Sequence, residues 1–120
     1  MLVSGDFGRL KQALVIGLDN AVKHSPPGAT IWVRTESEGR QVSISITDEG
    51  PGIAAEDLPH VFERFFRSRR GGEILNSGLG IGLSIAKDIS EQHAGSVSLE
   101  NGPNGGARFQ IVLPAFGEPN

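Results

Sequence analysis

The chain has 120 residues, a net charge of −3 and no cysteine. This length suits one domain with its own core, which we expect to span residues 1–120, and a hydrophobic fraction of 38% fits a globular protein. The lack of cysteine excludes a disulfide framework and a thiolate metal site, and the acidic balance argues against general nucleic-acid binding. The longest apolar stretch, residues 13–18, is too short to cross a bilayer.

The first half of the chain predicts a helix followed by a β-hairpin. Apolar residues recur at three- and four-residue steps over residues 7–24, which is typical of an amphipathic helix, and Asp6 is a suitable N-cap. Residues 30–36 and 42–48 alternate with period two around a turn at Glu38-Gly39. Because helical periodicity begins almost at the first residue, we expect a domain cut from a longer protein.

The second half predicts helices, a loop and a second hairpin. An apolar-aromatic segment at 58–66 indicates one or two small helices, and residues 67–78 lack periodicity and are interpreted as a loop. A long helix begins at Gly80, and two strands, residues 96–100 and 108–113, follow it. This order predicts an α/β two-layer sandwich with helices on one face of a mixed sheet.

Asp48 is the strongest single clue to function. The residues of its strand that share one face are Val42, Ile44 and Ile46. Asp48 is next in that phase, so the core face of the strand ends in a carboxylate, and a buried charge needs a donor. The Asp48 side chain could simply cap the following turn. However, Gly50 and Gly52 leave room for a flat ligand, and a carboxylate suits the exocyclic amine of adenine. Such a charge-assisted bond contributes about 1.5–3 kcal/mol, or roughly 10- to 100-fold in affinity.

A second candidate feature lies on the first helix. Gln12, Ile16, Asn20 and Lys23 fall on one strip beside the apolar face, and His24 ends the strip. Asn20 offers a neutral oxygen of the kind that Mg²⁺ accepts, and Lys23 is a point charge for phosphate. Taken alone, these residues fit the polar side of a half-exposed helix better than they fit a ligand site.

Alternate glycines form a third candidate feature at the start of the last long helix, in residues 78–83. Free backbone N–H groups at a helix N-terminus form an anion site. The spacing is neither the dinucleotide-binding fingerprint nor a Walker A motif, so a nucleotide would bind by another architecture. A basic cluster precedes the glycines: Arg64, Arg67, Arg69 and Arg70. Composition alone also fits a surface loop without a ligand.

Together these segments resemble the catalytic domains of two-component sensor histidine kinases, within the larger group that includes DNA gyrase and MutL. Residues 10–25 resemble the N-box, 48–52 the first glycine box, 61–67 the aromatic F-box, and 78–83, continuing into a helix that ends at 93–95, the second glycine box. The F-box distinguishes histidine kinases within the group. The resemblance covers nearly the whole chain.

The resemblance implies the Bergerat fold, a mixed five-stranded sheet with about three helices on one face, binding ATP under a lid at 67–77. It implies that Asp48 accepts from the adenine amine, that Asn20 coordinates Mg²⁺, and that Lys23 and Arg67 reach the phosphates; Asn20, Lys23 and Arg67 would be the catalytic residues. The other residues implied to contact ATP are His24, Gly50, Gly52, Ile53, Gly78, Leu79, Gly80, Gly82 and Leu83.

In such a kinase, phosphoryl transfer goes from ATP to a histidine on a separate dimerisation hairpin, and a response regulator follows downstream. None of the three histidines here, His24, His60 and His93, has the context of that acceptor. We therefore expect a monomeric fragment that binds nucleotide without phosphorylating itself. Family habit implies a cytoplasmic domain of a membrane-anchored sensor.

One position departs from the family pattern. An asparagine or another polar residue is usual four positions before the metal-binding asparagine, and this chain has Ile16. Isoleucine binds no metal, and here it interrupts an otherwise polar strip. This leaves a non-catalytic nucleotide-sensing module as an alternative to the kinase. A gyrase- or MutL-type ATPase fits less well because of the F-box, and a purely structural domain leaves Asp48 unexplained.

Overall fold

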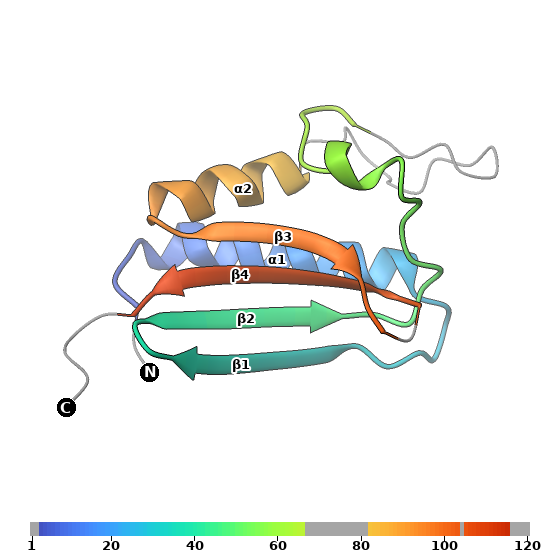
Figure 1. Cartoon of the computed structure of the whole chain (residues 1–120), viewed down its shortest axis with the longest axis horizontal. Helices are drawn as coiled ribbons and strands as arrows, with labels where there is room; N and C mark the ends of the chain where they lie inside the picture. The colour runs from blue at the N-terminus through green and yellow to red at the C-terminus, as the bar shows by residue number, and fades with distance from the viewer. Residues whose placement is uncertain (1–2, 67–81, 104, 116–120) are drawn as a thin grey trace.

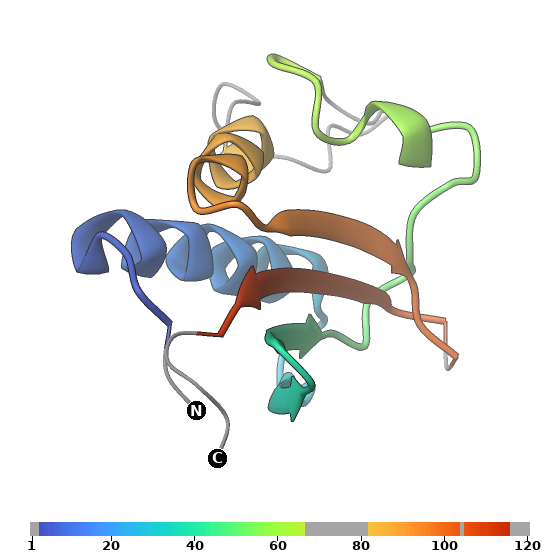
Figure 2. The same cartoon turned by 60° about the vertical axis from the view of Figure 1, so that its left-hand side comes forward.

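The computed structural model of the chain describes residues 3–66, 82–103 and 105–115. The elements in chain order are α1 (Phe7–His24), β1 (Trp32–Glu38), β2 (Gln41–Thr47), the 3₁₀ helix η1 (Leu58–His60), α2 (Gly82–Gln92), β3 (Ser96–Asn101) and β4 (Ala107–Pro114). Both α-helices lie on one face of the sheet, and the other face is open (Figures 1 and 2). The predicted α/β two-layer architecture is confirmed.

The sheet has the order β1-β2-β4-β3, and every neighbouring pair is antiparallel. The expectation of a mixed five-stranded sheet is therefore wrong for the described residues, which form four strands. The mixed sheet was predicted from the order of the elements and the fifth strand from the family resemblance, whereas the period-two pattern of this sequence marks four extended segments. The β1–β2 turn begins at Gly39, whose φ of 60° suits a tight two-residue hairpin turn.

Helix α1 forms as its sequence predicts. The Asp6 side chain accepts a hydrogen bond from the Arg9 backbone N–H (3.1 Å), which satisfies one free donor at the helix start. At the other end Ser25 has an extended backbone and leaves the helix before the two prolines. His93, just after α2, accepts from the Asp6 backbone N–H through Nε2 (3.0 Å) and so joins the start of α1 to the end of α2.

The core lies between the two helices and the sheet. Its largest fully buried aliphatic side chains are Ile46, Ile89 and Ile111, which come from β2, α2 and β4. Strand β4 alternates strictly, with inward residues Ala107, Phe109, Ile111 and Leu113. Helix α1 approaches β2 and β4 closely at Gly17, where a Cβ atom would lie 2.5 Å from the Phe109 ring. This contact sets the spacing between the helical layer and the sheet.

The segment predicted to hold one or two small helices contains only the three-residue η1 among the described residues. Pro59 lies in its first turn and contributes no backbone donor, so the turn does not extend into an α-helix. Phe65 has a φ of 67°, which is incompatible with a right-handed helix. No helix in the described part of the chain is long and apolar enough to cross a membrane.

Candidate nucleotide-binding site

Asp48 follows the last residue of β2, on the helical side of the sheet, and is 5% exposed. Its Oδ1 atom accepts from the backbone N–H groups of Gly50 (2.9 Å) and Ala107 (3.0 Å). Its own backbone N–H donates to the Ala107 carbonyl (2.9 Å). Both side-chain hydrogen bonds to described residues therefore use Oδ1, and Oδ2 keeps its acceptor capacity for a ligand. The predicted orientation and burial of Asp48 are confirmed.

The first glycine box folds tightly around this carboxylate because two positions have no space for a side chain. A Cβ atom on Gly50 would lie 2.2 Å from the His24 carbonyl oxygen, so the loop touches the end of α1 there. Gly52 has a φ of +79°, and a Cβ there would lie 2.5 Å from the Gly105 carbonyl oxygen. These glycines thus bring the C-terminus of α1 and the β3–β4 loop against Asp48.

The sequence interpretation missed the residues that support this loop from the β3–β4 connection. Asn101 Oδ1 accepts from the Ile53 backbone N–H (2.7 Å), and Asn101 Nδ2 donates to the Ile53 carbonyl (2.9 Å). A Cβ atom on Gly106 would lie 1.9 Å from the Asp48 carbonyl oxygen. The signal was present as an Asn-Gly-Pro-Asn-Gly-Gly run, but such a run marks any turn and names no partner.

On α1, Asn20 points toward the core side and is 8% exposed. An amide oxygen is a ligand that Mg²⁺ accepts, and an amide N–H can donate to a phosphate oxygen. Lys23, one turn on, instead forms an ion pair with Asp19 (2.8 Å) near the surface. Exposed i,i+4 pairs are weak, so a phosphate could replace Asp19 as the partner of Lys23.

Ile16 lies between Asn20 and the start of α2. Its side chain is half-buried and packs against the core cluster. Ile16 therefore belongs to the core more than the polar residues on the same strip had suggested. A Cβ atom on Gly82 would lie 3.6 Å from Ile16 Cγ2, which is ordinary van der Waals contact. The non-polar residue at this usually polar position therefore lies beside the first residue of α2.

The second glycine box is described only at its end. Gly82 begins α2 and Leu83 is buried in the core, so both stand across from the Ile16–Asn20 side of α1. Arg67, Gly78, Leu79 and Gly80, together with the predicted lid, lie outside the described residues. The structure brings together three segments of the predicted site: the end of α1, the loop after Asp48 and the first turn of α2.

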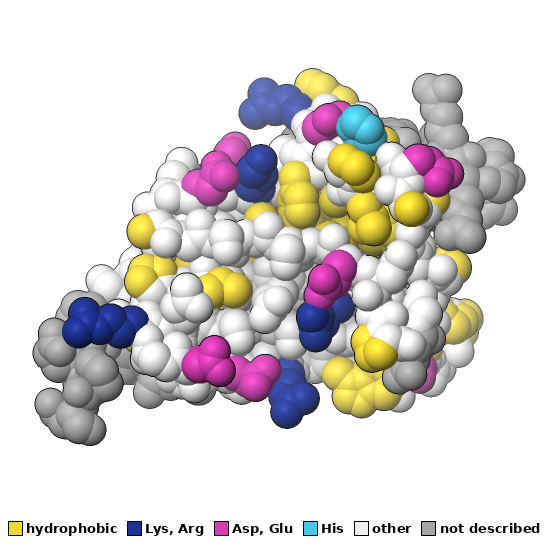
Figure 3. Space-filling view, in the orientation of Figure 1, with side chains coloured by type: hydrophobic (Ala, Val, Ile, Leu, Met, Phe, Trp, Pro, Cys, Tyr) yellow, Lys and Arg dark blue, Asp and Glu magenta, His cyan; other side chains and the backbone are white. Residues whose placement is uncertain are grey.

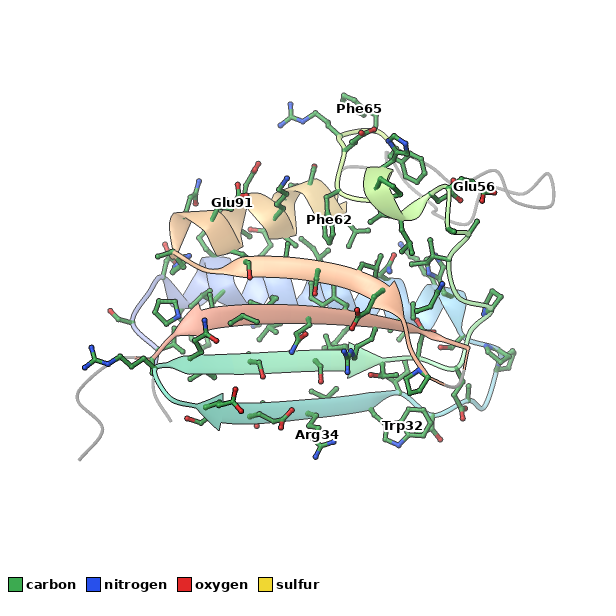
Figure 4. All side chains as sticks on the ribbon, in the orientation of Figure 1. Trp32, Arg34, Glu56, Phe62, Phe65 and Glu91 are labelled. Atoms are coloured by element: carbon green, nitrogen blue, oxygen red, sulfur yellow. The ribbon has the colours of Figure 1, made fainter. Side chains whose placement is uncertain are left out.

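The F-box segment lies beyond the start of α2, above the sheet (Figure 4). Phe62 and Phe66 pack against the core, whereas Phe65 is 64% exposed. His60 stacks on Phe66 with ring centroids 6.0 Å apart, and its Nδ1 lies 2.9 Å from Glu63 Oε2. His60 is exposed, although its ring has these two partners.

A metal ion would find few protein ligands here. The described residues contain no cluster of three or more histidine, cysteine or acidic side chains that could hold an ion. Mg²⁺ commonly binds through one or two protein oxygens together with substrate phosphates and water. The Asn20 oxygen fits that mode, and it would act as the single protein ligand from α1.

Comparison with known proteins agrees with this geometry. Residues 5–116 match the family model of histidine kinase-, DNA gyrase B- and HSP90-like ATPases. The chain is 36% identical over 117 residues to the sensor-like histidine kinase SenX3 of Mycolicibacterium smegmatis, covering 98% of this chain and 30% of SenX3. It is 40% identical over 116 residues to the sensor protein KdpD of Clostridium acetobutylicum, covering 95% of this chain and 13% of KdpD. The chain thus spans less than a third of these relatives.

Solved structures show the same likeness. The mycobacterial sensor histidine kinase MprB superposes with a TM-score of 0.81 at 38% identity, covering 93% of this chain and 74% of that one. The nucleotide-free catalytic domain of the histidine kinase ThkA superposes with a TM-score of 0.79 at 31% identity, covering 93% and 70%. The chain belongs to the histidine kinase-, DNA gyrase B- and HSP90-like ATPase family, and within it to the ATP-binding catalytic domains of two-component sensor histidine kinases.

Proposed function

We propose that residues 1–120 form one catalytic domain that binds Mg-ATP and donates its γ-phosphoryl group to a histidine on a separate dimerisation domain. The observation that carries the proposal is the buried Asp48 carboxylate, held through Oδ1 by two backbone N–H groups. The exocyclic amine of adenine is a donor that suits Oδ2. The space beside Gly50 and Gly52 is filled by the His24 and Gly105 carbonyls, so these glycines fix the loop around the carboxylate and do not leave the expected room for a flat ligand.

The phosphates would extend from this pocket along the gap between α1 and the start of α2. Asn20 would supply the protein oxygen for Mg²⁺, and Lys23 would exchange Asp19 for a phosphate oxygen. Bound Mg²⁺ would neutralise charge on the phosphates during transfer. Gly82 and Leu83 would border the phosphates from α2, while Arg67, Gly78, Leu79 and Gly80 remain predicted contacts. The task of the domain is positioning and electrostatic stabilisation, without a covalent intermediate.

The acceptor histidine would lie on another domain of the same protein. His93 uses both ring nitrogens, one toward Asp6 and one toward the Ile89 carbonyl (2.8 Å). His60 is bound to Glu63, and the His24 carbonyl closes the glycine loop. The exposed Phe65 offers an apolar contact for the dimerisation hairpin. A response regulator would receive the phosphoryl group afterwards. The domain itself would be monomeric. In the intact protein, a membrane-anchored sensor, it would face the cytoplasm.

Phosphoryl transfer tests this proposal. The domain is incubated with γ-labelled ATP and Mg²⁺, alone and with the dimerisation hairpin of its own protein as a separate polypeptide. Label should appear on the hairpin only, and Asp48→Asn should slow its appearance, whereas the matched surface variant Glu63→Gln should not. Label on the domain alone would contradict the proposal, and steady ATP hydrolysis without the hairpin would favour a gyrase-type ATPase.

Ile16 favours a second candidate function, a nucleotide-sensing module with weak transfer. Its methyl groups occupy the space beside Asn20 and Gly82, where a polar side chain could order the metal or a water molecule. If this module is the true function, ATP binds but little label reaches the hairpin. Ile16→Asn should then raise the transfer rate, with Ile16→Val as the non-polar control. A transfer rate that is already high in the unchanged domain would exclude this candidate.

A further inference from the structure

One flank of α1 exposes a row of apolar side chains to water. Phe7, Val15, Leu18 and Val22 are between 38% and 80% exposed, and they recur at steps of eight, three and four residues. At helical spacing they lie on one line along α1, and Lys11 is the only charged residue on that line. We call these five residues the flank strip. A contiguous exposed apolar surface of this kind marks an interface.

The flank strip faces away from α2. Successive residues of an α-helix are turned by about 100° around the axis. Ile16 contacts the start of α2, and the next residue, Gly17, faces the sheet, where a Cβ atom would lie 3.0 Å from Ile46 Cδ1. Leu18 is turned by a further 100° in the same direction. The strip therefore lies on the side of α1 opposite to α2, above the β1–β2 half of the sheet.

The helical side of the sheet is also uncovered in that half. Val33 of β1 pairs in register with Ile46 of β2, so it is the next side chain outward from the core on the same face. Val33 is 57% exposed, and every residue of β1 is exposed. Figures 1 and 2 show no helix over β1. On the opposite face of the sheet uncharged polar surface predominates (Figure 3), so that face has less need of a cover.

An amphipathic helix fits this surface. The flank strip extends from Phe7 to Val22, about 22 Å along α1. A helix of similar length, laid beside α1 and over β1, would bury the strip and Val33 together, as neighbouring helices on a sheet do. Lys11 would need an acidic residue on that helix. A second copy of the chain fits less well, because its strip brings another lysine and no acid, and burying both lysines unpaired is costly.

The position of the strip also favours one source for this helix. The polypeptide enters α1 at its N-cap Asp6, next to Phe7, so a segment on the N-terminal side of α1 has the shortest route to the strip. The solved ThkA domain, 70% of which is covered by this chain, has residues outside the matched part. We propose that the flank strip is the docking site for an amphipathic helix of the intact protein, from the N-terminal side of α1, with an acidic residue facing Lys11.

Protection of a single cysteine tests this proposal, because the chain has no cysteine of its own. Val15→Cys is made in the 120-residue chain and in the intact protein, and its labelling by a maleimide is followed by mass spectrometry of the peptide that carries it. We expect labelling to be about tenfold slower or more in the intact protein. Glu91→Cys, on the exposed side of α2 (Figure 4), is the matched control and should be labelled equally fast in both.

Charge reversal tests the predicted acidic contact. In the intact protein, Lys11→Glu should speed the labelling of Val15→Cys about threefold or more, whereas Lys87→Glu on α2 should not. Equal labelling of Val15→Cys in the chain and in the intact protein would overturn the proposal, and an unchanged rate in Lys11→Glu would contradict the acidic partner. Protection that rises with the concentration of the 120-residue chain would instead identify a second copy as the occupant, and protection by an added, separate dimerisation hairpin would identify the hairpin. Either result would also overturn the proposal.

Discussion

At the residue scale, the site depends on groups that fix one carboxylate in place. Asp48 is held by backbone N–H groups of its own turn and of β4, so its position is determined before any ligand arrives. The sequence predicted this residue because its phase in the strand and the following glycines can be seen locally. It did not predict Asn101, whose role depends on a contact between residues 48 positions apart.

Substitutions at Gly52 and Gly28 can distinguish the cost of a left-handed backbone from the cost of steric overlap. Both have nearly the same φ, +79° and +80°, but a Cβ would meet neighbouring atoms only at Gly52. Gly28→Ala should cost about 1–2 kcal/mol in the free energy of unfolding, the penalty for a left-handed residue. Gly52→Ala should cost about 1–3 kcal/mol more, because of overpacking, and should also weaken binding of an ATP analogue. Urea unfolding measures both; equal values would contradict the close approach at Gly52.

Asn101 should affect stability and ligand binding together. Asn101→Ala removes two hydrogen bonds to Ile53, so we expect a loss of about 1–3 kcal/mol in the free energy of unfolding and weaker binding of an ATP analogue. Asn101→Asp keeps the acceptor for the Ile53 N–H and should fall between the alanine variant and the unchanged protein. Unfolding curves and titration calorimetry measure the two effects. Unchanged affinity in Asn101→Ala would show that this clamp does not support the pocket.

At the element scale, α1 carries both a core face and a site face. Its limits, its cap and its apolar face follow from local signals, which is why the helix was predicted correctly over residues 7–24. The segment at 58–66 was predicted less well. Its apolar and aromatic composition favoured one or two small helices, but Pro59 and the positive φ of Phe65 leave only a 3₁₀ turn. The packing of Phe62 and Phe66 onto the core decides its path, and local composition does not contain that information.

Two glycines within α1 provide a matched test of how the helix packs. Gly8→Ala meets only an ordinary contact, 3.5 Å from Asp6 Oδ1, and should raise the free energy of unfolding by about 0.5–1 kcal/mol through helix propensity. Gly17→Ala would place its Cβ 2.5 Å from the Phe109 ring, and it should lower the free energy of unfolding by about 1–3 kcal/mol. Chemical denaturation decides; stabilisation by both variants would show that α1 lies farther from the sheet.

At the scale of the whole molecule, the two faces of one sheet are built differently. The helical face contains the core and the Asp48 carboxylate, and the helices leave the other face uncovered. The α/β class followed from the order of helices and hairpins, but the antiparallel order β1-β2-β4-β3 did not, because strand neighbours depend on non-local pairing.

The measurement that tests the central claim most directly is calorimetric titration with a non-hydrolysable ATP analogue, with and without Mg²⁺, on the unchanged domain and on Asp48→Asn. We expect Mg²⁺ to tighten binding and Asp48→Asn to weaken it about tenfold or more, because the variant loses a charge-assisted hydrogen bond to adenine. Asp19→Asn, an exposed carboxylate on α1, is the control and should not weaken binding. No binding by the folded, unchanged domain, or equal affinity in Asp48→Asn, would contradict the account.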